Sequence, residues 1–312
     1  RPIGVMGYYR LGPWRRHFCR YAEAGEVPPL RVLREDSASK DASYAKAAYW
    51  DGIVEDMGTQ AHYLDPFLGE MKRRAHLSLV DRWCPEPSPG WVLKTDLFED
   101  ATGPGAFLAD LPDNAGPVVG VDLSPAICLE ARRRDTQAGA YYVAADVRHL
   151  PFSEQSFSLV VSPSTLDHFP DPADLGRSLE GLRRVLKWHG HLILTLDNRQ
   201  NIFDPLLRLA IRLGRVPYYV GRAYTLTEIA DEVRAVGLEA RGTTTILHNP
   251  RLVAVGAVWL ANRLGWLWLK RFVRRVLASA QRLQDTRWQH WTGSFVAVDA
   301  VRTDVDGSGE IR

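Results

Sequence analysis

The sequence contains no apolar run long enough to cross a membrane as a helix. Residues 252–269 are mostly apolar, but Asn262 and Arg263 interrupt them, and a spanning helix needs about 20 mostly apolar residues. No signal peptide is visible. These absences favour a cytoplasmic protein over one that crosses a membrane.

Cysteine is also scarce, with three residues among 312. Cys19, Cys84 and Cys128 show neither metal-ligand spacing nor the even number of a disulfide framework, which fits a reducing compartment. The histidines include no pair with metal-ligand spacing, so we expect no metal. The net charge of +2 excludes recognition of a polyanion by the charge of the whole chain alone, and we expect no nucleic-acid partner.

What the sequence does have is an alternation of short apolar runs with helical segments. The runs occupy residues 91–97, 117–123, 140–146, 157–162 and 191–196. The segments with helical character occupy about 104–111, 124–136 and 172–187. Such an alternation is typical of a parallel sheet with helices on both faces.

A further helix and two closing strands follow. Residues 225–240 have helical character, with Thr225 or Thr227 as the N-cap and Gly237 as the stop. Residues 241–247 and 293–301 have the pattern of a closing pair of strands.

Three of the apolar runs end in aspartate, at Asp96, Asp122 and Asp146. Ligands of a doubly wound sheet lie at the carboxyl ends of the strands. A carboxylate there accepts both ribose hydroxyls of a nucleoside after the second strand, and an adenine amino group after the third. The alternative for each aspartate alone is a helix cap or turn residue. Three in register favour a nucleoside ligand.

The first loop, within "VLKTDLFEDATGPGAFL" (92–108), lacks an early glycine pattern. A dinucleotide would need a glycine-rich turn that seats its pyrophosphate on a helix N-terminus. This loop carries Glu99 and Asp100 instead, which repel pyrophosphate but suit a sulfonium or an α-amino group. Charge therefore favours S-adenosylmethionine over NAD.

Three longer motifs carry a family resemblance: "VVGVDLSPAICLEAR", "AADVRHLPFSEQSFSLVVSPSTLDHFPDP" and "LRRVLKWHGHLILTLDN". With them, roughly residues 91–247 and 292–302 resemble class I S-adenosylmethionine-dependent methyltransferases of the ubiquinone-biosynthesis-like branch. The last motif has Trp188 and His189 in place of the family's Pro-Gly turn.

The resemblance implies an α/β fold with a doubly wound, mostly parallel, Rossmann-like seven-stranded sheet. We expect a helical N-terminal lid over residues 1–90 and a core over 91–302, with insertions at about 201–222 and 249–291. Residues 303–312 have the composition of a disordered tail.

The first loop departs from the family's acid-x-Gly-x-Gly-x-Gly pattern. With Asp96 as the acid, Phe98, Asp100 and Thr102 stand where glycines are expected. We expect a remodelled loop in which Gly103 and Gly105 supply the turn. The alternative is a loop that has lost its ligand, which leaves a protein without activity. The aspartates after the second and third strands favour a functional site.

By resemblance, the residues that contact the cofactor are Thr95, Asp96, Glu99, Gly103, Asp122, Leu123, Asp146, Val147 and Ser162. Asp167 and His168 follow the fourth strand. His168 is the candidate for a general base, and Asp167 is the candidate for the carboxylate that orients it. The alternative is that His168 packs under the cofactor and Asp167 caps a helix. Candidates for contacts with the acceptor are Tyr44 and Trp50 in the lid, and His248 after the sixth strand.

The second insertion is basic and rich in tryptophan. Residues 251–291 hold eight Lys or Arg, one acidic residue and five of the ten Trp. From Leu269 to Leu283 the wheel of a helix has one apolar and one basic face. Such a helix contacts an anionic membrane or covers a lipophilic acceptor; the alternative is a surface helix packed on the core. We expect peripheral membrane contact through residues 252–283.

The residues and the resemblance together predict methyl transfer from S-adenosylmethionine by in-line displacement. The two apolar and basic insertions favour a small, hydrophobic or lipid-like acceptor. The alternative is a donor-binding protein of the same fold without methyl transfer, or one that uses the sulfonium for other chemistry. "SPSTLDHF" after the fourth strand lacks the Asn/Asp-Pro-Pro-aromatic motif, which argues against methylation of bases.

Overall fold

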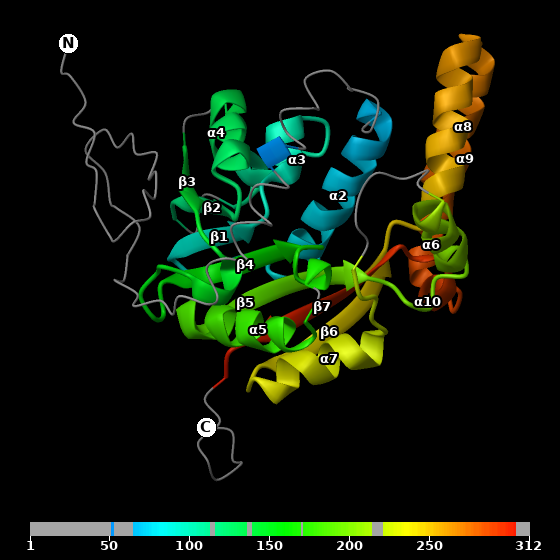
Figure 1. The fold of residues 1–312 in the computed structure, drawn as a ribbon. Coiled ribbons are helices and arrows are strands. Elements are labelled where there is room, and N and C mark those ends of the chain that lie inside the picture. The colour runs from blue at the N-terminus through cyan, green and yellow to red at the C-terminus, as the bar shows by residue number, and fades with distance from the viewer. Residues whose placement is uncertain are drawn as a thin grey trace, which may run out of the picture.

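The computed structural model describes residues 51–52, 65–112, 116–135, 139–169, 171–213 and 221–303. Seven strands form one sheet in the order β3-β2-β1-β4-β5-β7-β6 (Figure 1). Their bounds are Trp91–Thr95 (β1), Val118–Asp122 (β2), Ala140–Ala144 (β3), Phe157–Pro163 (β4), Leu186–Asp197 (β5), Glu239–Ile246 (β6) and Phe295–Val301 (β7). Strands β1 to β5 pair in parallel, and β7 is antiparallel to β5 and β6. The prediction of a mostly parallel, Rossmann-like sheet is confirmed.

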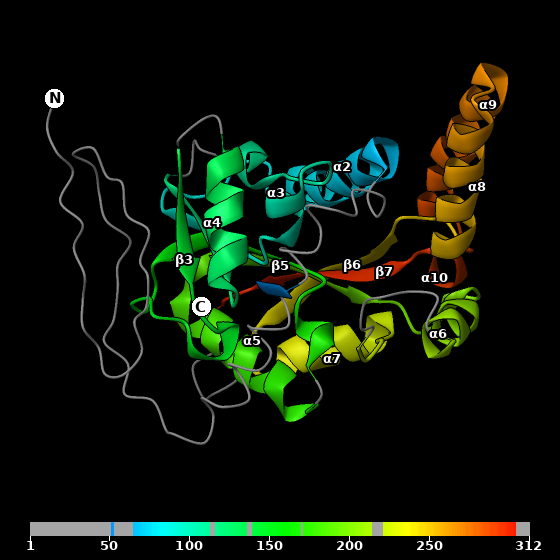
Figure 2. The ribbon, with the colours of Figure 1, turned by 45° about the horizontal axis from the view of Figure 1, so that its top comes forward.

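Helices cover both faces of the sheet, as Figures 1 and 2 show. The helices α2 (Pro66–Trp83), α3 (Phe98–Thr102) and α4 (Pro125–Arg134) lie on one face, and α5 (Ala173–Val185) and α7 (Leu226–Ala235) lie on the other. Neighbouring strand residues alternate between the two layers: Val92 packs in the α2–α4 layer and Leu93 in the α5–α7 layer. Because both faces are covered, the inner strands are largely buried, with apolar side chains on both faces.

The first helix after β1 lies earlier than predicted. Instead of a helix over 104–111, the chain forms α3 at once and then a short 3-10 turn at Leu108–Asp110. Gly103 ends α3 with a φ of 112°, which a residue with a Cβ rarely adopts. The carboxylate of Asp100 accepts hydrogen bonds from the backbone of Phe107 and Leu108. The polar side chains of "FEDAT" therefore stabilise a helical turn where a remodelled loop was expected.

The start of β5 differs from the prediction, and the structure decides between two predicted N-caps of α7. Strand β5 begins at Leu186, five residues before the predicted start at His191, and pairs there with Phe157. His189 lies within it at a φ of 59°, at the place of the family's Pro-Gly turn. Thr225, not Thr227, caps α7, and it forms a reciprocal capping box with Glu228.

The two insertions form helices at one end of the sheet. The first contributes α6 (Asp204–Arg212), and the second contributes α8 (Arg251–Leu264), α9 (Leu267–Ala280) and α10 (Gln289–Thr292). Figures 1 and 2 show α8 and α9 side by side, standing out from the sheet. They attach to α2 through a small cluster of Ala254, Val258 and Leu277 against Phe67, Leu68, Met71 and Val273. The helix predicted over 269–283 starts two residues earlier and ends in a 3-10 turn after Ala280.

Candidate active site

The candidate site lies where the order of the strands reverses, between β1 and β4. The carboxyl ends of β1, β2 and β4 meet there, and this is the place where doubly wound sheets bind ligands. Thr95 ends β1, and its hydroxyl donates to that of Ser162 on β4 over 2.8 Å. Both side chains are buried. The structure thus brings together two residues that were predicted separately as cofactor contacts.

Asp122 ends β2, and its carboxylate is oriented by the backbone. Its two carboxylate oxygens each accept one backbone hydrogen bond of 2.9 Å, from Leu97 and from Ser124. A carboxylate has about four acceptor positions, so each oxygen keeps capacity for a ribose hydroxyl. Burial raises the pKa of Asp122 to about 6, against the effect of the two backbone donors. The two backbone donors therefore fix the orientation of the Asp122 carboxylate.

Asp96, the first residue after β1, has an unusual backbone conformation. Its φ is 84°, a region that costs of order 1–3 kcal/mol for a residue with a Cβ. Its carboxylate accepts a hydrogen bond of 2.7 Å from the backbone of Phe98. Burial, followed by the charge of Glu99, raises the pKa of Asp96 well above its usual value. A strained, half-buried carboxyl beside Asp122 suits a cationic ligand, whose charge would favour the ionised forms of both.

Glu99 and Asp100 each form an ion pair with a lysine of the protein, and the predicted contact between Glu99 and the cofactor stays a prediction. Glu99 forms an ion pair with Lys72 of α2. Although burial acts in the opposite direction, Lys72 and Lys94 lower the pKa of Glu99 to about 2. Asp100 forms an ion pair with Lys94 over 2.6 Å. Both carboxylates thus have a basic partner within the protein, and neither is left to face a ligand alone.

Lys94 organises the loop that was expected to hold glycines. Its side chain is fully buried and its ammonium lies 4.5 Å from the centre of the Phe107 ring. The ammonium donates to the carboxylate of Asp100 and to the backbone oxygen of Asp96. Burial lowers the pKa of Lys94, but the carboxylates of Asp100, Asp96 and Glu99 outweigh burial and raise it overall. An internal ion pair therefore sets the path of this loop.

Gly103 and Leu123 are two further residues that were predicted to contact the cofactor. A Cβ on Gly103 would lie 3.0 Å from the guanidinium of Arg134, so the predicted turn role of this glycine fits its surroundings. Leu123 follows Asp122 and is half-buried. Neither placement tests the predicted contact with a cofactor.

Asp146, which follows β3, forms more hydrogen bonds within the protein than the sequence indicated. The carboxylate of Asp146 accepts from the guanidinium of Arg148 over 2.6 and 3.0 Å, and from its backbone over 2.9 Å. Arg148 also donates to Asp174 over 2.8 Å. Asp146 therefore caps a 3-10 turn, the alternative that the sequence left open, and Val147 is buried in that turn. An adenine amino group would have to share this carboxylate with Arg148.

Asp167 and His168 lie in a 3-10 turn after β4, but their settings differ. Asp167 is fully buried, and one of its oxygens accepts from the backbone of Asp197 over 2.8 Å and from Ser164 over 3.2 Å. Burial, opposed by His168, raises the pKa of Asp167. The His168 side chain is 24% exposed, and its Nε2 lies 3.8 Å from Asp167. Asp167 thus joins the ends of β4 and β5, and His168 alone reaches the surface.

The predicted acceptor contacts receive little support. Tyr44 and Trp50 lie outside the described residues. His248 is buried, and its ring nitrogens lie 2.9 Å from the hydroxyl of Thr292 and 3.2 Å from the backbone oxygen of Thr245. This placement speaks against contact between His248 and an acceptor, because the ring is already engaged by structural partners.

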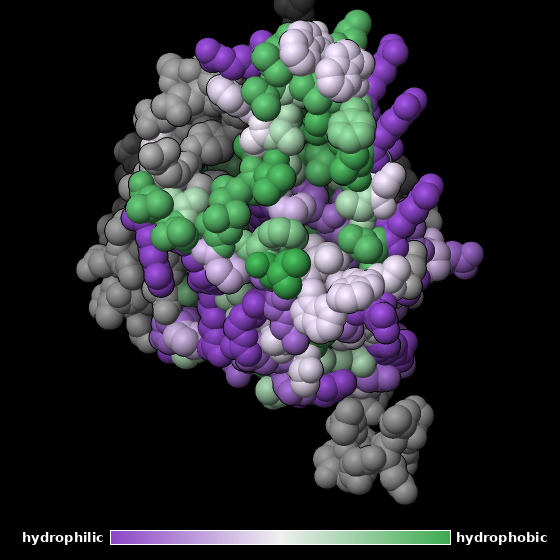
Figure 3. Space-filling model, turned by 90° about the vertical axis from the view of Figure 1, so that its right-hand side faces the viewer, coloured by the Kyte–Doolittle hydropathy of each residue, from purple (hydrophilic) through white to green (hydrophobic). Residues whose placement is uncertain are grey.

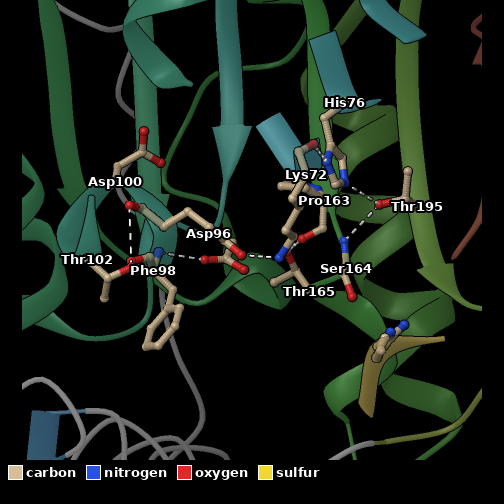
Figure 4. Close-up of polar contacts among 12 residues, drawn as sticks. Lys72, His76, Asp96, Phe98, Asp100, Thr102, Pro163, Ser164, Thr165 and Thr195 are labelled. Atoms are coloured by element: carbon tan, nitrogen blue, oxygen red, sulfur yellow. Dashed lines mark hydrogen bonds and ion pairs between the residues drawn. The ribbon is translucent and has the colours of Figure 1, made fainter. Parts of the chain in front are cut away.

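Sequence reasoning missed the contribution of α2. Figure 4 shows Lys72 reaching from α2 toward the ends of β1 and β4, beside Asp96 and Thr165. In the same view His76 points to Thr195, over 3.3 Å, and Thr195 also accepts from the backbone of Ser164 over 3.1 Å. Burial, together with Lys72, lowers the pKa of His76 to about 4, so the imidazole is neutral. No local pattern could reveal a contact between residues 119 positions apart.

A metal centre is not formed by the part of the chain that the structure describes. None of its groups of three or more His, Cys, Asp or Glu side chains could hold a metal ion. The two described cysteines, Cys84 and Cys128, are buried.

Comparison with known proteins identifies the domain around this site. Residues 99–194 match the family model of a methyltransferase domain. The fold is that of class I S-adenosylmethionine-dependent methyltransferases. An S-adenosylmethionine-dependent methyltransferase from Mesorhizobium loti superimposes with a TM-score of 0.51 at 17% identity, covering 73% of this chain and 98% of that one. A phosphoethanolamine N-methyltransferase of Haemonchus contortus, in complex with phosphomonomethylethanolamine and S-adenosylhomocysteine, gives 0.54 at 16% identity, over 84% and 60%.

The curated relatives are similar over shorter segments. An uncharacterised methyltransferase of Bacillus subtilis, YodH, is 36% identical over 99 residues, which are 31% of this chain and 41% of the relative. A ubiquinone biosynthesis O-methyltransferase of Bordetella parapertussis is 24% identical over 179 residues, 52% of this chain and 72% of the relative. The chain thus spans about two fifths of the first of these relatives. The predicted methyltransferase class and its cofactor, S-adenosylmethionine, are supported, whereas the finer branch stays a prediction.

Proposed function

We propose that this protein transfers the methyl group of S-adenosylmethionine to a small, lipophilic acceptor. The observation that carries the proposal is Asp122 at the end of β2, with both oxygens oriented by backbone donors and both with spare acceptor capacity. It lies in the segment that matches a methyltransferase domain. A half-buried carboxyl with a raised pKa fits a ligand that brings two hydroxyl donors and a positive charge.

Bound S-adenosylmethionine would supply an electrophilic methyl group on its sulfonium. Asp122 would hold the ribose, and Asp96 would face the positively charged part of the cofactor. Thr95 and Ser162, joined by their hydrogen bond, would fix the floor between them. The chain's main contribution to the rate is to align donor and acceptor and to exclude water, because an in-line displacement needs little other chemistry.

An acceptor that must lose a proton would require a base, and we assign this role to His168. It follows β4 directly and is the partly exposed member of the pair. Asp167 acts as a positioning residue, since it is buried and joins the ends of β4 and β5.

The lipophilic character of the acceptor is supported by the surroundings of the site. A pocket between α6 and α8 has lining residues that include Asn198, Phe203, Leu206, Arg251 and Val253. It begins at Asn198, directly after β5, and opens between the two apolar insertions. The Bordetella relative is named for ubiquinone biosynthesis, which supports a ring-containing lipid as the type of acceptor.

We also propose that the N-terminal region covers the cofactor. Asp51 accepts hydrogen bonds from the Ser124 hydroxyl and the Ala126 backbone at the start of α4. This contact lies next to Asp122, whose carboxylate accepts from the backbone of Ser124. A segment held there would shield the ribose from water.

Calorimetric titration tests the cofactor site. S-adenosylmethionine and S-adenosylhomocysteine are titrated into the unmodified protein, Asp122→Ala and Asp231→Ala. Asp231 is an exposed carboxylate of α7 and serves as the control. We expect about a hundredfold or greater loss of affinity for Asp122→Ala only, because two hydrogen bonds to a charged group are lost. Equal affinity of all three proteins would contradict the assignment.

Methyl transfer itself is tested with an acceptor series at saturating cofactor. Release of S-adenosylhomocysteine is compared for phenols with and without a prenyl chain. We expect turnover that increases with the chain. Cofactor binding without turnover of any acceptor would favour the alternative, a donor-binding protein that does not transfer methyl groups.

A further inference from the structure

The two insertions carry nearly all of the exposed apolar surface of the described chain. Of 18 large hydrophobic residues that are exposed, 16 lie between residues 202 and 291, and only Leu129 and Trp188 lie outside the insertions. Figure 3 shows hydrophobic side chains, in green, gathered on this end of the molecule, with hydrophilic side chains, in purple, projecting at the edge. Contiguous apolar surface of this kind marks an interaction site on a water-soluble domain.

Helix α9 presents an organised apolar stripe. Trp268, Phe272 and Val276 follow one another at intervals of four residues and are 64%, 59% and 50% exposed. Residues at this spacing lie on one face of a helix. Leu277 and Val273 occupy the other side and pack toward α2. The stripe is therefore not the face that attaches the helix to the core.

Positive charge flanks the stripe without acidic compensation. Arg271 and Arg275 are exposed on α9, and neither forms an ion pair within the described residues. Residues 251–291 as a whole carry eight basic residues against one acidic residue. An apolar stripe beside a basic stripe is the pattern of a helix that lies in the headgroup region of an anionic bilayer.

Three tryptophans lie on the exposed surface of α8 and of the turn that leads to α9. Trp266 and Trp268 stack at the turn between α8 and α9, with ring centres 5.8 Å apart, and Trp259 is 56% exposed on α8. Tryptophan is enriched at the level of lipid headgroups because its ring is apolar and its N–H is polar.

We infer that the surface formed by α6, α8 and α9 binds the face of an anionic lipid bilayer. None of the described helices is long and apolar enough to cross a membrane, and α8 and α9 have 14 residues each, about 21 Å. The helices therefore lie on the bilayer. A second copy of the chain is the less suitable partner, because a two-fold interface would bring two strongly basic segments together.

This orientation places the pocket between α6 and α8 at the bilayer. Leu206 and Val253 line that pocket and are exposed on the same surface. A lipid-like acceptor would then pass from the bilayer toward the end of β5. This last step depends on the proposed function, whereas bilayer binding does not.

Co-sedimentation with vesicles tests the inference. Vesicles of phosphatidylcholine alone are compared with vesicles that also contain phosphatidylglycerol. The variants are Phe272→Glu/Val276→Glu and Arg271→Gln/Arg275→Gln. The controls are Leu129→Glu, an exposed apolar residue of α4, and Arg177→Gln/Arg234→Gln, exposed residues of α5 and α7.

We expect binding to the anionic vesicles that weakens with salt. The arginine variant should bind about 25-fold more weakly, since each basic side chain near an anionic surface contributes about fivefold. The glutamate variant should lose binding, and both controls should keep it. Circular dichroism and titration with S-adenosylhomocysteine verify that each variant is folded and that the cofactor site is unaffected.

Three results would overturn the inference. The first is absence of binding by the unmodified protein, and the second is equal binding of the variants and their controls. The third is a dimer, detected by light scattering, that Phe272→Glu/Val276→Glu dissociates, since a second copy would then be the partner. Loss of cofactor binding with vesicle binding intact would count only against the proposed function.

Discussion

At the scale of single residues, the acidic side chains of the site fall into two groups that differ in their pKa values and in their ion pairs. Lys94 and Lys72 form ion pairs with Asp100 and Glu99, while Asp96 and Asp122 have raised pKa values and form no ion pair with a lysine among the described residues. The loop is held by ion pairs inside the protein that involve neither Asp96 nor Asp122. Glycines let the backbone approach a ligand closely because they have no side chain. In this loop the side chains of Glu99 and Asp100 instead form ion pairs with lysines of the protein.

The ion pair of Lys94 can be tested by substitution. Lys94→Met leaves Asp100 buried beside an apolar side chain, and we expect it to lower the free energy of unfolding by about 3–5 kcal/mol. Lys94→Met/Asp100→Asn should recover most of this loss, because Asn keeps an oxygen that accepts from Phe107 and Leu108 but carries no charge. Urea denaturation of the three proteins provides the comparison. A double variant as unstable as the single one would refute the pairing.

At the scale of secondary-structure elements, the segment before α7 is clamped against the turn that holds Asp167 and His168. Gly221 packs on the backbone of Asp167, and the amide of Arg222 donates to the same carbonyl over 2.9 Å. A Cβ on Gly221 would lie 1.6 Å from that oxygen. The two segments therefore cannot coexist in this arrangement with any larger residue at position 221.

Two glycine substitutions with opposite expected effects test this packing. Gly221→Ala should destabilise the protein by about 1–3 kcal/mol, as overpacking does, and should reduce methyl transfer because it displaces the turn of Asp167. Gly256→Ala is the control: it lies within α8 with no atom within 4 Å of a new Cβ, and it should stabilise the protein by about 0.5–1 kcal/mol. Thermal unfolding and turnover report both effects. Equal effects of the two substitutions would mean that the clamp is absent.

At the scale of the whole molecule, the protein combines an apolar core on each face of the sheet with exposed apolar side chains on the helices of the two insertions. The apolar side chains of the sheet are buried against helices on both faces, whereas α6, α8 and α9 leave large ones exposed. The core stabilises the fold, and the exposed end costs solubility unless a partner covers it.

The pH dependence of stability also belongs to the whole molecule. The folded protein holds a proton on Asp122 up to a pKa of about 6, and the unfolded chain loses it near 3.8. The folded state thus binds more protons between these values, and stability of the unliganded protein should fall as pH rises from about 4 to 6. The effect of this one carboxyl is at most about 3 kcal/mol. Glu99, with a pKa of about 2, contributes stability that is lost only below this window.

Cofactor should reverse this trend, because a cation and two ribose donors favour the ionised carboxyl. We expect S-adenosylmethionine to bind about tenfold more weakly for each pH unit below 6. Urea denaturation at pH 5 and 7.5, with and without cofactor, measures both effects, and Asp122→Asn should flatten both. An unchanged cofactor affinity between these pH values would exclude Asp122 as the titrating group.

The sequence by itself determined the layered architecture. Strand and helix positions follow from periodicity, because a residue's burial in a repeating structure depends on its local spacing. The same logic located Asp122, since the end of a parallel strand is a position in space as well as in sequence. The helix after β1 was misplaced because polar side chains acted on a turn too short to show a period, and the start of β5 was placed five residues too late.

Only the tertiary structure decided how the charges of the site are paired. Lys72 meets Glu99, and His76 meets Thr195, although nothing in either neighbourhood along the chain indicates the partner. The pKa values of Asp122 and Glu99 diverge to about 6 and about 2 for the same reason. A carboxyl's charge depends on burial and on the distance to the nearest ammonium, and both are properties of the folded chain.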